Sequence, residues 1–439
     1  MSTYSITLPP SRARWIDPFL FAAIAVLAYG LCRATPMSTP LLTSVLVGSV
    51  TIVMCLLELW DAPWRNSPRP EIAWPLILRR TGVKWLGVMA GVAMLLTAWW
   101  ALPEYRQPRY RAFFAVSHIL LPWVPFATVP SILWAEWRIG PKEDDRWHFG
   151  LLLLGRWKEI DWQQIRQGLM GWFIKGFFLP VNFSGASDLI GHFRGMEGQL
   201  LSAEWPKAVF FADAMMFATL GIAILPGYLF SARIFNNELK KVDCTWFGWV
   251  VTLSCYPPFN SVVSGRWFAY ESKVDAQWMP PWTAWGLHSM GVAHLIGGIL
   301  LLLEFFHFWG ESSFGLRSSN LSNRGILTNG PYRFCKHPIY LSKCVGWLII
   351  WAPIGLGRPV SEIFRWLLLF CSWCGIYAMR CWAEEKLLSD DPDYVAYGLW
   401  MDRNGLFRFL GRSIPLFSYE WRLKRWQALG QPPVILKTS

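Results

Sequence analysis

Residues 39–60 read TPLLTSVLVGSVTIVMCLLELW, an almost uninterrupted apolar run. About 20 mostly apolar residues cross the hydrocarbon core of a bilayer as an α-helix, so this run predicts a membrane-spanning helix. Similar runs recur along the chain and predict an all-α fold, a polytopic integral membrane bundle of about ten transmembrane helices. The predicted spans cover residues 17–34, 39–60, 82–102, 112–134, 168–190, 207–230, 244–259, 283–309, 341–357 and 360–381.

The composition of the 439 residues agrees with a membrane protein. Hydrophobic residues make up 54% of the chain and charged residues only 16%, against about 25% charged residues in soluble domains. The 30 Trp residues suit the boundary between hydrocarbon and headgroups. These values argue against a soluble, a disordered or a disulfide-stapled protein. Most of the nine cysteines lie in or beside apolar runs, and Cys371-x-x-Cys374 has no second pair at ligand spacing, so no metal site is expected.

The net charge of +12 gives an orientation. Basic residues fall mainly between the apolar runs, which is the positive-inside pattern and favours contact with membrane lipids rather than nucleic acid. Arg65, Arg69 and Arg79 follow the second predicted span. We therefore expect a multi-pass protein whose N-terminus is cytosolic.

The segment 168–190 is the least certain span by hydropathy, because it contains Lys175, Pro180 and Asp188. If it crosses the membrane, the basic loop 233–241 is cytosolic, as the positive-inside pattern requires. We therefore predict a crossing that is irregular or broken at Pro180. Backbone freed by proline at membrane depth must be buried or line a wet cavity, so this segment is also a candidate wall of a substrate cavity.

The chain divides into three predicted parts. Residues 1–280 form a multi-span region of unknown role, which can build an acceptor cavity, bind a protein partner or form a homo-oligomer. Residues 281–400 carry the chemistry described below. Residues 401–439 are a basic, aromatic tail that suits a cytosolic helix lying on the surface. The run 149–154 is likewise expected to lie along the membrane surface.

Two polar clusters flank the last pair of predicted spans. The first reads TNGPYRFCKHPIY over 328–340, and the second reads RCWAEEKLL over 380–388, followed by DPDYVAY over 391–397. Both lie at one membrane face, because a helical hairpin joins them, and they can converge on one ligand. Cationic groups there suit a carboxylate, glutamates suit ribose hydroxyls or an ammonium, and rings suit adenine or a sulfonium. S-adenosylmethionine has all of these parts, and the chain lacks the glycine-rich turn of a Rossmann-type site.

This spacing of Gly-x-Tyr, basic-His-Pro-x-Tyr, Arg-x-x-x-Glu-Glu and Tyr-x-x-Tyr resembles the integral-membrane methyltransferases, the superfamily of isoprenylcysteine carboxyl methyltransferases and phospholipid N-methyltransferases. The resemblance covers about residues 285–400. It implies an S-adenosylmethionine-dependent enzyme with a cytosolic cofactor site. Its acceptor would be a lipophilic molecule, a lipid or a prenylated compound, that enters from the bilayer. The carboxylate or amine of that molecule would receive the methyl group. The implied cofactor contacts are Gly330, Tyr332, Lys336, His337, Pro338, Tyr340, Glu384, Glu385, Tyr394 and Tyr397, and the implied catalytic residues are Arg380 and Glu384.

The chain departs from the family pattern at three places. Lys336 stands where the family has arginine, Ser342 where a glycine is common, and Asp391-Pro392 where Phe-Gly is usual. These departures bear on acceptor geometry more than on cofactor binding. A carboxylate acceptor needs no base, whereas an amine must lose its proton, with which Glu384 can help. The sequence leaves O- and N-methylation open.

Two other function classes fit the same architecture. A membrane sterol- or enone-type reductase that uses NADPH has a distantly similar C-terminal region, but its usual His-Pro-Asn-Tyr is His337-Pro-Ile-Tyr340 here. A non-enzymatic transporter or scaffold is the third hypothesis.

Glu304-x-x-His307 has a metal-ligand spacing, but without a second carboxylate-rich helix it predicts an interfacial pair or a wall of the cofactor pocket. Asp213, an ionisable group inside a span, is close enough to the interface to be merely solvated.

Overall fold

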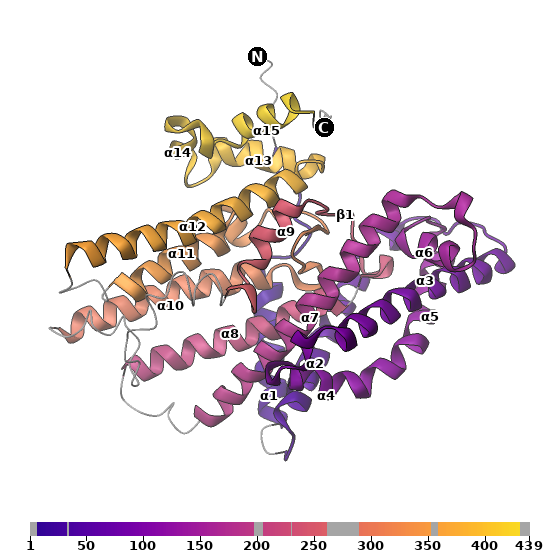
Figure 1. The fold of residues 1–439 in the computed structure, drawn as a ribbon, viewed down its shortest axis with the longest axis horizontal. Helices are drawn as coiled ribbons and strands as arrows, with labels where there is room; N and C mark the ends of the chain where they lie inside the picture. Colours follow the sequence, from indigo (N-terminus) through magenta and orange to yellow (C-terminus); the bar gives the residue numbers. More distant parts are fainter. Residues whose placement is uncertain are drawn as a thin grey trace.

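The chain folds almost entirely into helices, and the computed structural model describes residues 7–32, 35–196, 205–229, 231–260, 289–352 and 359–430. Figure 1 shows the course of the chain. The first helices are α1 (Asp17–Cys32), α2 (Thr39–Trp60), α3 (Trp74–Ala101), α4 (Arg111–Leu120), α5 (Val124–Trp134), α6 (Asp145–Leu153), α7 (Trp162–Met196) and α8 (Trp205–Leu229). The later helices are α9 (Trp246–Leu253), α10 (Met290–Ser312), α11 (Pro338–Trp351), α12 (Val360–Leu388), α13 (Pro392–Asn404), α14 (Arg408–Ser413) and α15 (Tyr419–Ala428).

Six helical segments of the described residues are long and apolar enough to cross a membrane, which makes this a multi-pass membrane architecture. These segments are α2, α3, α4 with α5, α8, α10 and α12. The ten predicted spans are therefore confirmed only in part. Helices α1 and α11 are apolar but short, and α10 begins at Met290, so that the start of the span predicted over 283–309 falls outside the described residues. The predicted domain boundary near residue 280 also falls outside them.

The prediction of a span over 244–259 is wrong. This apolar run contains only α9, with eight residues. A crossing needs about 20 residues. The helix ends before Pro257 and Pro258, and proline cannot continue a helix because it lacks the backbone N–H. The run therefore forms a short helix that packs against α12 instead of crossing the membrane.

Helix α7 explains why hydropathy left residues 168–190 undecided. It is one continuous helix of 35 residues that passes through Pro180, so the predicted break is absent. It packs against α2, α3, α4, α6 and α8, and its Phe178 and Ile174 are buried. A helix surrounded by protein does not need the apolar surface that lipid requires, and α7 is not among the six apolar segments.

Helices α3 and α6 cross at two glycines. A Cβ atom at Gly87 would lie 2.0 Å from the carbonyl oxygen of Arg146, and one at Gly150 would lie 2.0 Å from that of Val83. The backbones therefore touch at this crossing. Phe149, Gly150 and Leu151, the first residues of the 149–154 run, are buried. The expectation that this run lies along the membrane surface is wrong for its buried part, because α6 packs into the bundle.

Loops from distant parts of the chain meet at one end of the helices. Strand β1 (Lys241–Val242) pairs antiparallel with β2 (Ser322–Asn323), so the basic loop after α8 lies beside the loop after α10. The extended segment 7–14 runs along residues 326–329, with the Arg12 N–H donating to the carbonyl of Ile326 at 3.0 Å. The N-terminal segment and the predicted motif loop therefore lie at the same end.

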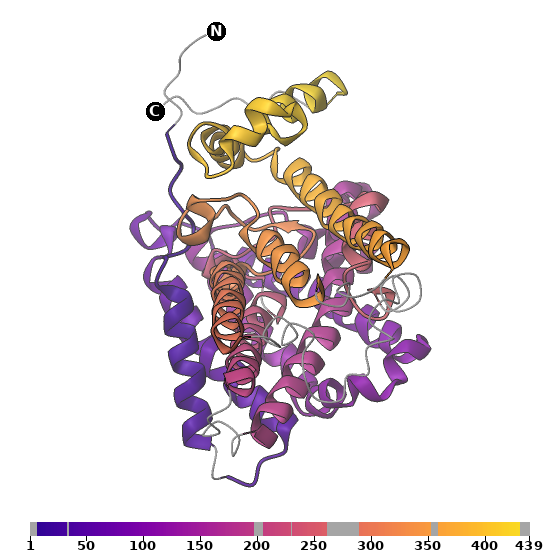
Figure 2. The same cartoon turned by 90° about the vertical axis from the view of Figure 1, so that its left-hand side faces the viewer.

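The tail forms a small layer over the end of α12, where α13, α14 and α15 lie together (Figures 1 and 2). Residue 400, the predicted domain boundary, lies inside α13. Tyr419 and Trp426 of α15 are buried and belong to one apolar cluster with Tyr332 and Tyr397. The tail is therefore packed onto the motif segment, and α15 is a packed helix rather than one lying free on a membrane surface.

Candidate functional site

The first polar cluster folds as a tight loop that leads into α11. A short 3₁₀ turn covers Gly330–Arg333. Gly330 has a positive φ of 55°, and a Cβ atom there would lie 3.1 Å from the ring nitrogen of Trp309, so glycine is favoured by backbone and space alike. Pro338 occupies the first turn of α11, where its missing N–H costs nothing. This local structure fixes His337 at the start of α11 and Tyr340 one turn later.

The second cluster faces the first from α12 and α13. Asp391 caps α13 by accepting a hydrogen bond from the Asp393 N–H. At Asp391-Pro392, where the chain departs from the family pattern, the aspartate thus serves as a helix cap. The Tyr397 hydroxyl on α13 donates to the carbonyl oxygen of Tyr332 at 2.6 Å. Tyr332 in turn donates to the carbonyl oxygen of Gly310 at 3.2 Å. These bonds join the motif loop to α10 and α13.

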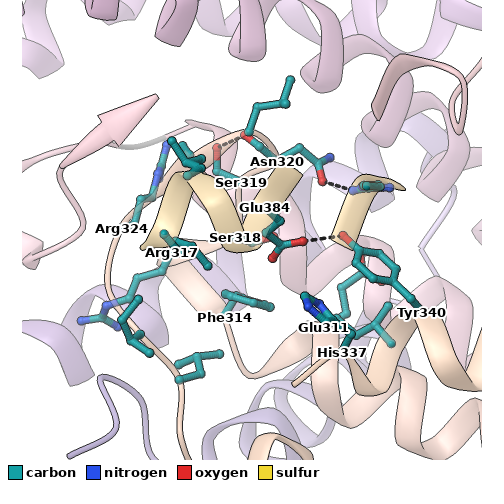
Figure 3. A pocket seen from close by; sticks show the side chains of 18 of the residues that line it. Glu311, Phe314, Arg317, Ser318, Ser319, Asn320, Arg324, His337, Tyr340 and Glu384 are labelled. Atoms are coloured by element: carbon teal, nitrogen blue, oxygen red, sulfur yellow. Dashed lines mark hydrogen bonds between the residues drawn. The ribbon is translucent and has the colours of Figure 1, made fainter. Parts of the chain in front are cut away.

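The two clusters converge on one polar cavity, part of which Figure 3 shows. Its volume is about 120 Å³. Because pockets for small molecules hold about 300–1,000 Å³, a ligand of nucleoside size fits only after the lining moves. The sequence-predicted residues that line the cavity are Tyr332, Lys336, His337, Pro338, Tyr340, Arg380, Glu384, Tyr394 and Tyr397.

Two hydrogen bonds link the clusters across the cavity wall. The Tyr340 hydroxyl donates to a carboxylate oxygen of Glu384 at 2.9 Å (Figure 3). His337 Nε2 lies 3.0 Å from Oε1 of Glu385. The rings of His337 and Tyr340 stack, with centroids 5.7 Å apart and planes at 19°. The partners of each bond are more than 40 residues apart in sequence, so folding brings them together.

Glu385 lies behind this wall and does not line the cavity. It is buried, and its carboxylate contacts His337, Lys336 at 3.4 Å and Arg422 of α15. Burial disfavours a charged imidazole at His337, but the Cys381 sulfur and the bond to Glu385 outweigh burial, so the pKa of His337 is raised well above its ordinary value. Glu385 therefore joins the motif loop to the tail. Gly330, the other predicted contact outside the lining, shapes the loop.

Arg380 lines the cavity with its guanidinium. This cation forms no ion pair with a carboxylate of the described residues. Its side chain is buried, and its guanidinium lies 5.0 Å from the ring centroid of Tyr340 and 5.4 Å from that of Tyr256. It donates to the side-chain oxygen of Asn320, whose amide donates to the Tyr256 hydroxyl at 3.0 Å. Ring faces and a neutral amide thus hold a cation that remains able to bind an anion.

Several lining residues carry no motif and were missed by the sequence pattern. Glu311 lines the cavity, lies 2.8 Å from His307 Nε2 and is 3.8 Å from Lys343. Its spacing of four residues from His307 on α10 was a usable signal, because such residues share a helix face. His307 itself is buried and also contacts Glu304 at 3.1 Å. The predicted Glu304–His307 pair is thus part of a chain of charges that reaches the cavity through Glu311.

A buried polar atom in the lining supports a polar ligand. The Tyr394 hydroxyl forms no hydrogen bond with the residues that the structure describes, and Tyr394 lines the cavity. A buried polar group left unsatisfied costs about 1–3 kcal/mol. A ligand with acceptor atoms would remove that cost, so the residues present fit a zwitterionic, nucleoside-like molecule once the cavity opens.

Comparison of the chain with family models, with curated proteins and with solved structures finds no match.

Proposed function

We propose that this chain is an integral-membrane S-adenosylmethionine-dependent methyltransferase that transfers a methyl group to a lipophilic acceptor at the cytosolic face. The observation that supports it best is the convergence of the two halves of the motif on one cavity, through Tyr340–Glu384 and His337–Glu385. A cation, a carboxylate and stacked rings line that cavity, which is the set of groups a charged nucleoside cofactor needs.

Each lining group has a stated task in this proposal. S-adenosylmethionine supplies an electrophilic methyl group when it is bound. Arg380 binds its carboxylate, because its guanidinium lines the cavity and forms no close ion pair with a carboxylate of the described residues. Glu384 accepts hydrogen bonds from ribose hydroxyls or receives a proton from an amine acceptor. The rings of Tyr340 and Tyr394 stack on the base or face the sulfonium.

Catalysis then depends mainly on contact between donor and acceptor in a dry site. Tyr394 and Tyr397 of α13 form part of the cavity wall, and α15 packs on α13 and the motif loop. Because the closed volume is too small for the cofactor, we propose that the tail layer moves outward on binding. The acceptor reaches the site from the hydrocarbon side.

Titration calorimetry of the purified protein with S-adenosylmethionine and, separately, with NADPH tests this function. We expect heat of binding only with S-adenosylmethionine, and we expect His337→Ala and Glu384→Ala to abolish it while the protein stays folded. Lys158→Met changes an exposed residue that does not line the cavity; it is the matched control and should bind normally. Binding of NADPH alone would favour a reductase, and binding of neither by folded protein would favour a scaffold or transporter.

A further inference from the structure

The N-terminal helices enclose a second cavity that the proposed reaction does not use. Its volume is about 1040 Å³, and it shares no lining residue with the polar cavity. Residues of α2, α3, α4, α5, α7 and α8 line it. This volume lies just above the range of about 300–1,000 Å³ that small-molecule pockets hold. The segment 168–190, which the sequence suggested as a cavity wall, forms part of the wall of this cavity.

Most of the cavity wall is apolar. Val47 from α2, Leu95 and Trp99 from α3, and Phe113 and Val116 from α4 are buried side chains that line it. All five lie in segments that are long and apolar enough to cross a membrane. A cavity lined this way at membrane depth suits a hydrocarbon chain, because transfer of such a chain from water is favourable and lipid itself can enter sideways.

The opposite end of the cavity is charged, and its acids are largely neutralised. Glu238 pairs with Lys142 at 2.9 Å. Asp144 pairs with Lys84 at 3.0 Å, and Asp390 pairs with Lys241. Three of the acidic residues at this end are therefore neutralised. The net charge of this end depends on the charged residues outside these pairs.

Two cations remain without a carboxylate partner at this end. Arg146 and Lys175 line the cavity and belong to none of the ion pairs found in the described ranges. The ammonium of Lys175 donates only to the backbone carbonyl of Tyr228, at 2.8 Å. Asp145 and the exposed Glu143 are the acidic lining residues outside the three pairs above. Six basic and five acidic side chains line the cavity in all, so this end carries a positive excess of one formal charge.

We propose that this cavity binds one membrane lipid, with its acyl chain along the apolar wall and an anionic carboxylate or phosphate headgroup between Arg146 and Lys175. An anion there forms charge-assisted hydrogen bonds, which are about twice as strong as neutral ones. The headgroup end adjoins the polar cavity, since Arg324 lines the polar cavity and donates at 2.9 Å to Ser231, which lines the larger one. The proposal does not depend on methyl transfer.

Photolabelling with a stearate that carries a diazirine tests this site in the purified full-length protein. We expect light-dependent labelling of peptides from α2, α4 and α7 that line the cavity. Gly48→Phe should abolish this labelling, because Gly48 lines the cavity and a Cβ atom there meets nothing within 4 Å. Lys175→Met should raise the stearate concentration for half-maximal labelling about tenfold, the effect of one charged hydrogen bond.

Matched controls separate filling of the cavity from general damage. Gly82→Phe adds the same ring to α3 at an exposed glycine that also has open space, and Lys158→Met removes an exposed charge. Both should label like the unaltered protein. Equal labelling of the Gly48→Phe variant would overturn the site. Equal half-maximal concentrations for the stearate and its methyl ester on the unaltered protein would overturn the anionic headgroup, even if a variant fails to fold.

Discussion

Arg380 and Glu384 lie one turn apart on α12 and have different neighbours. Arg380 is held by the rings of Tyr340 and Tyr256 and by a neutral amide. Glu384 accepts a bond from the Tyr340 hydroxyl. The next residue, Glu385, binds three basic groups and faces away from the cavity. Two adjacent glutamates thus have separate tasks, one toward a ligand and one toward the tail.

Replacement of Glu385 by alanine should destabilise the protein strongly. Without the buried Glu385 carboxylate, the partly buried Lys336, His337 and Arg422 are left close together. Removal of one partner from a buried ion pair costs about 3–5 kcal/mol. Equilibrium unfolding in mixed micelles measures the free energy. Glu420→Ala breaks an exposed pair with Lys424 and should cost about 1 kcal/mol or less. Equal losses for the two variants would contradict the role of Glu385.

The raised pKa of His337 predicts a pH dependence of stability. A group whose pKa is raised by folding stabilises the native state fully below its unfolded pKa, about 6.5 for histidine. That contribution is lost as the pH rises through the raised folded pKa. The unaltered protein should therefore exceed His337→Gln in melting temperature most at mildly acidic pH. An advantage that grows as the pH rises would contradict the bond to Glu385.

At the scale of helices and strands, the α3–α6 crossing is the most sensitive contact. Gly150→Ala places a Cβ atom 2.0 Å from a backbone carbonyl of α3, and such overpacking costs about 1–3 kcal/mol. Gly82→Ala, in open space on the same helix pair, should be neutral or stabilise by up to about 1 kcal/mol. Unfolding in mixed micelles compares them, and an unchanged Gly150→Ala variant would show that the helices do not touch there.

The extent to which sequence predicted these elements follows from what surrounds them. Helix α2 was predicted with its observed bounds, because lipid selects a long apolar run. Helix α7 was ambiguous because protein surrounds it. A span was wrongly predicted at α9 because a short packed helix can lie in an equally apolar run. In the site, residues with a motif spacing, such as His337 and Glu384, were found. Asn320 was missed because tertiary packing alone brings it to Arg380.

At the scale of the whole molecule, both ends of the described chain lie on one side. Residues 7–14 bind the motif loop, and α15 packs on the same loop through Arg422–Glu385. Reporter fusions at the two termini should therefore report the same side of the membrane, and the positive-inside pattern predicts the cytosol. Alkaline phosphatase fused to either end should be inactive. Activity at one end only would contradict the packing of the tail on the motif loop.

The central claim is methyl transfer to a lipophilic acceptor at the polar cavity. Its most direct test is the transfer of labelled methyl groups from S-adenosylmethionine into organic-extractable material, with the purified protein in vesicles of its native membrane lipids. We expect extractable label with the unaltered protein. We expect a loss of at least about 100-fold for Glu384→Gln, if the acceptor is an amine that needs a base, and for Arg380→Met through lost cofactor binding. No extractable label from a folded protein, or equal label from Arg380→Met, would contradict methyl transfer at this cavity.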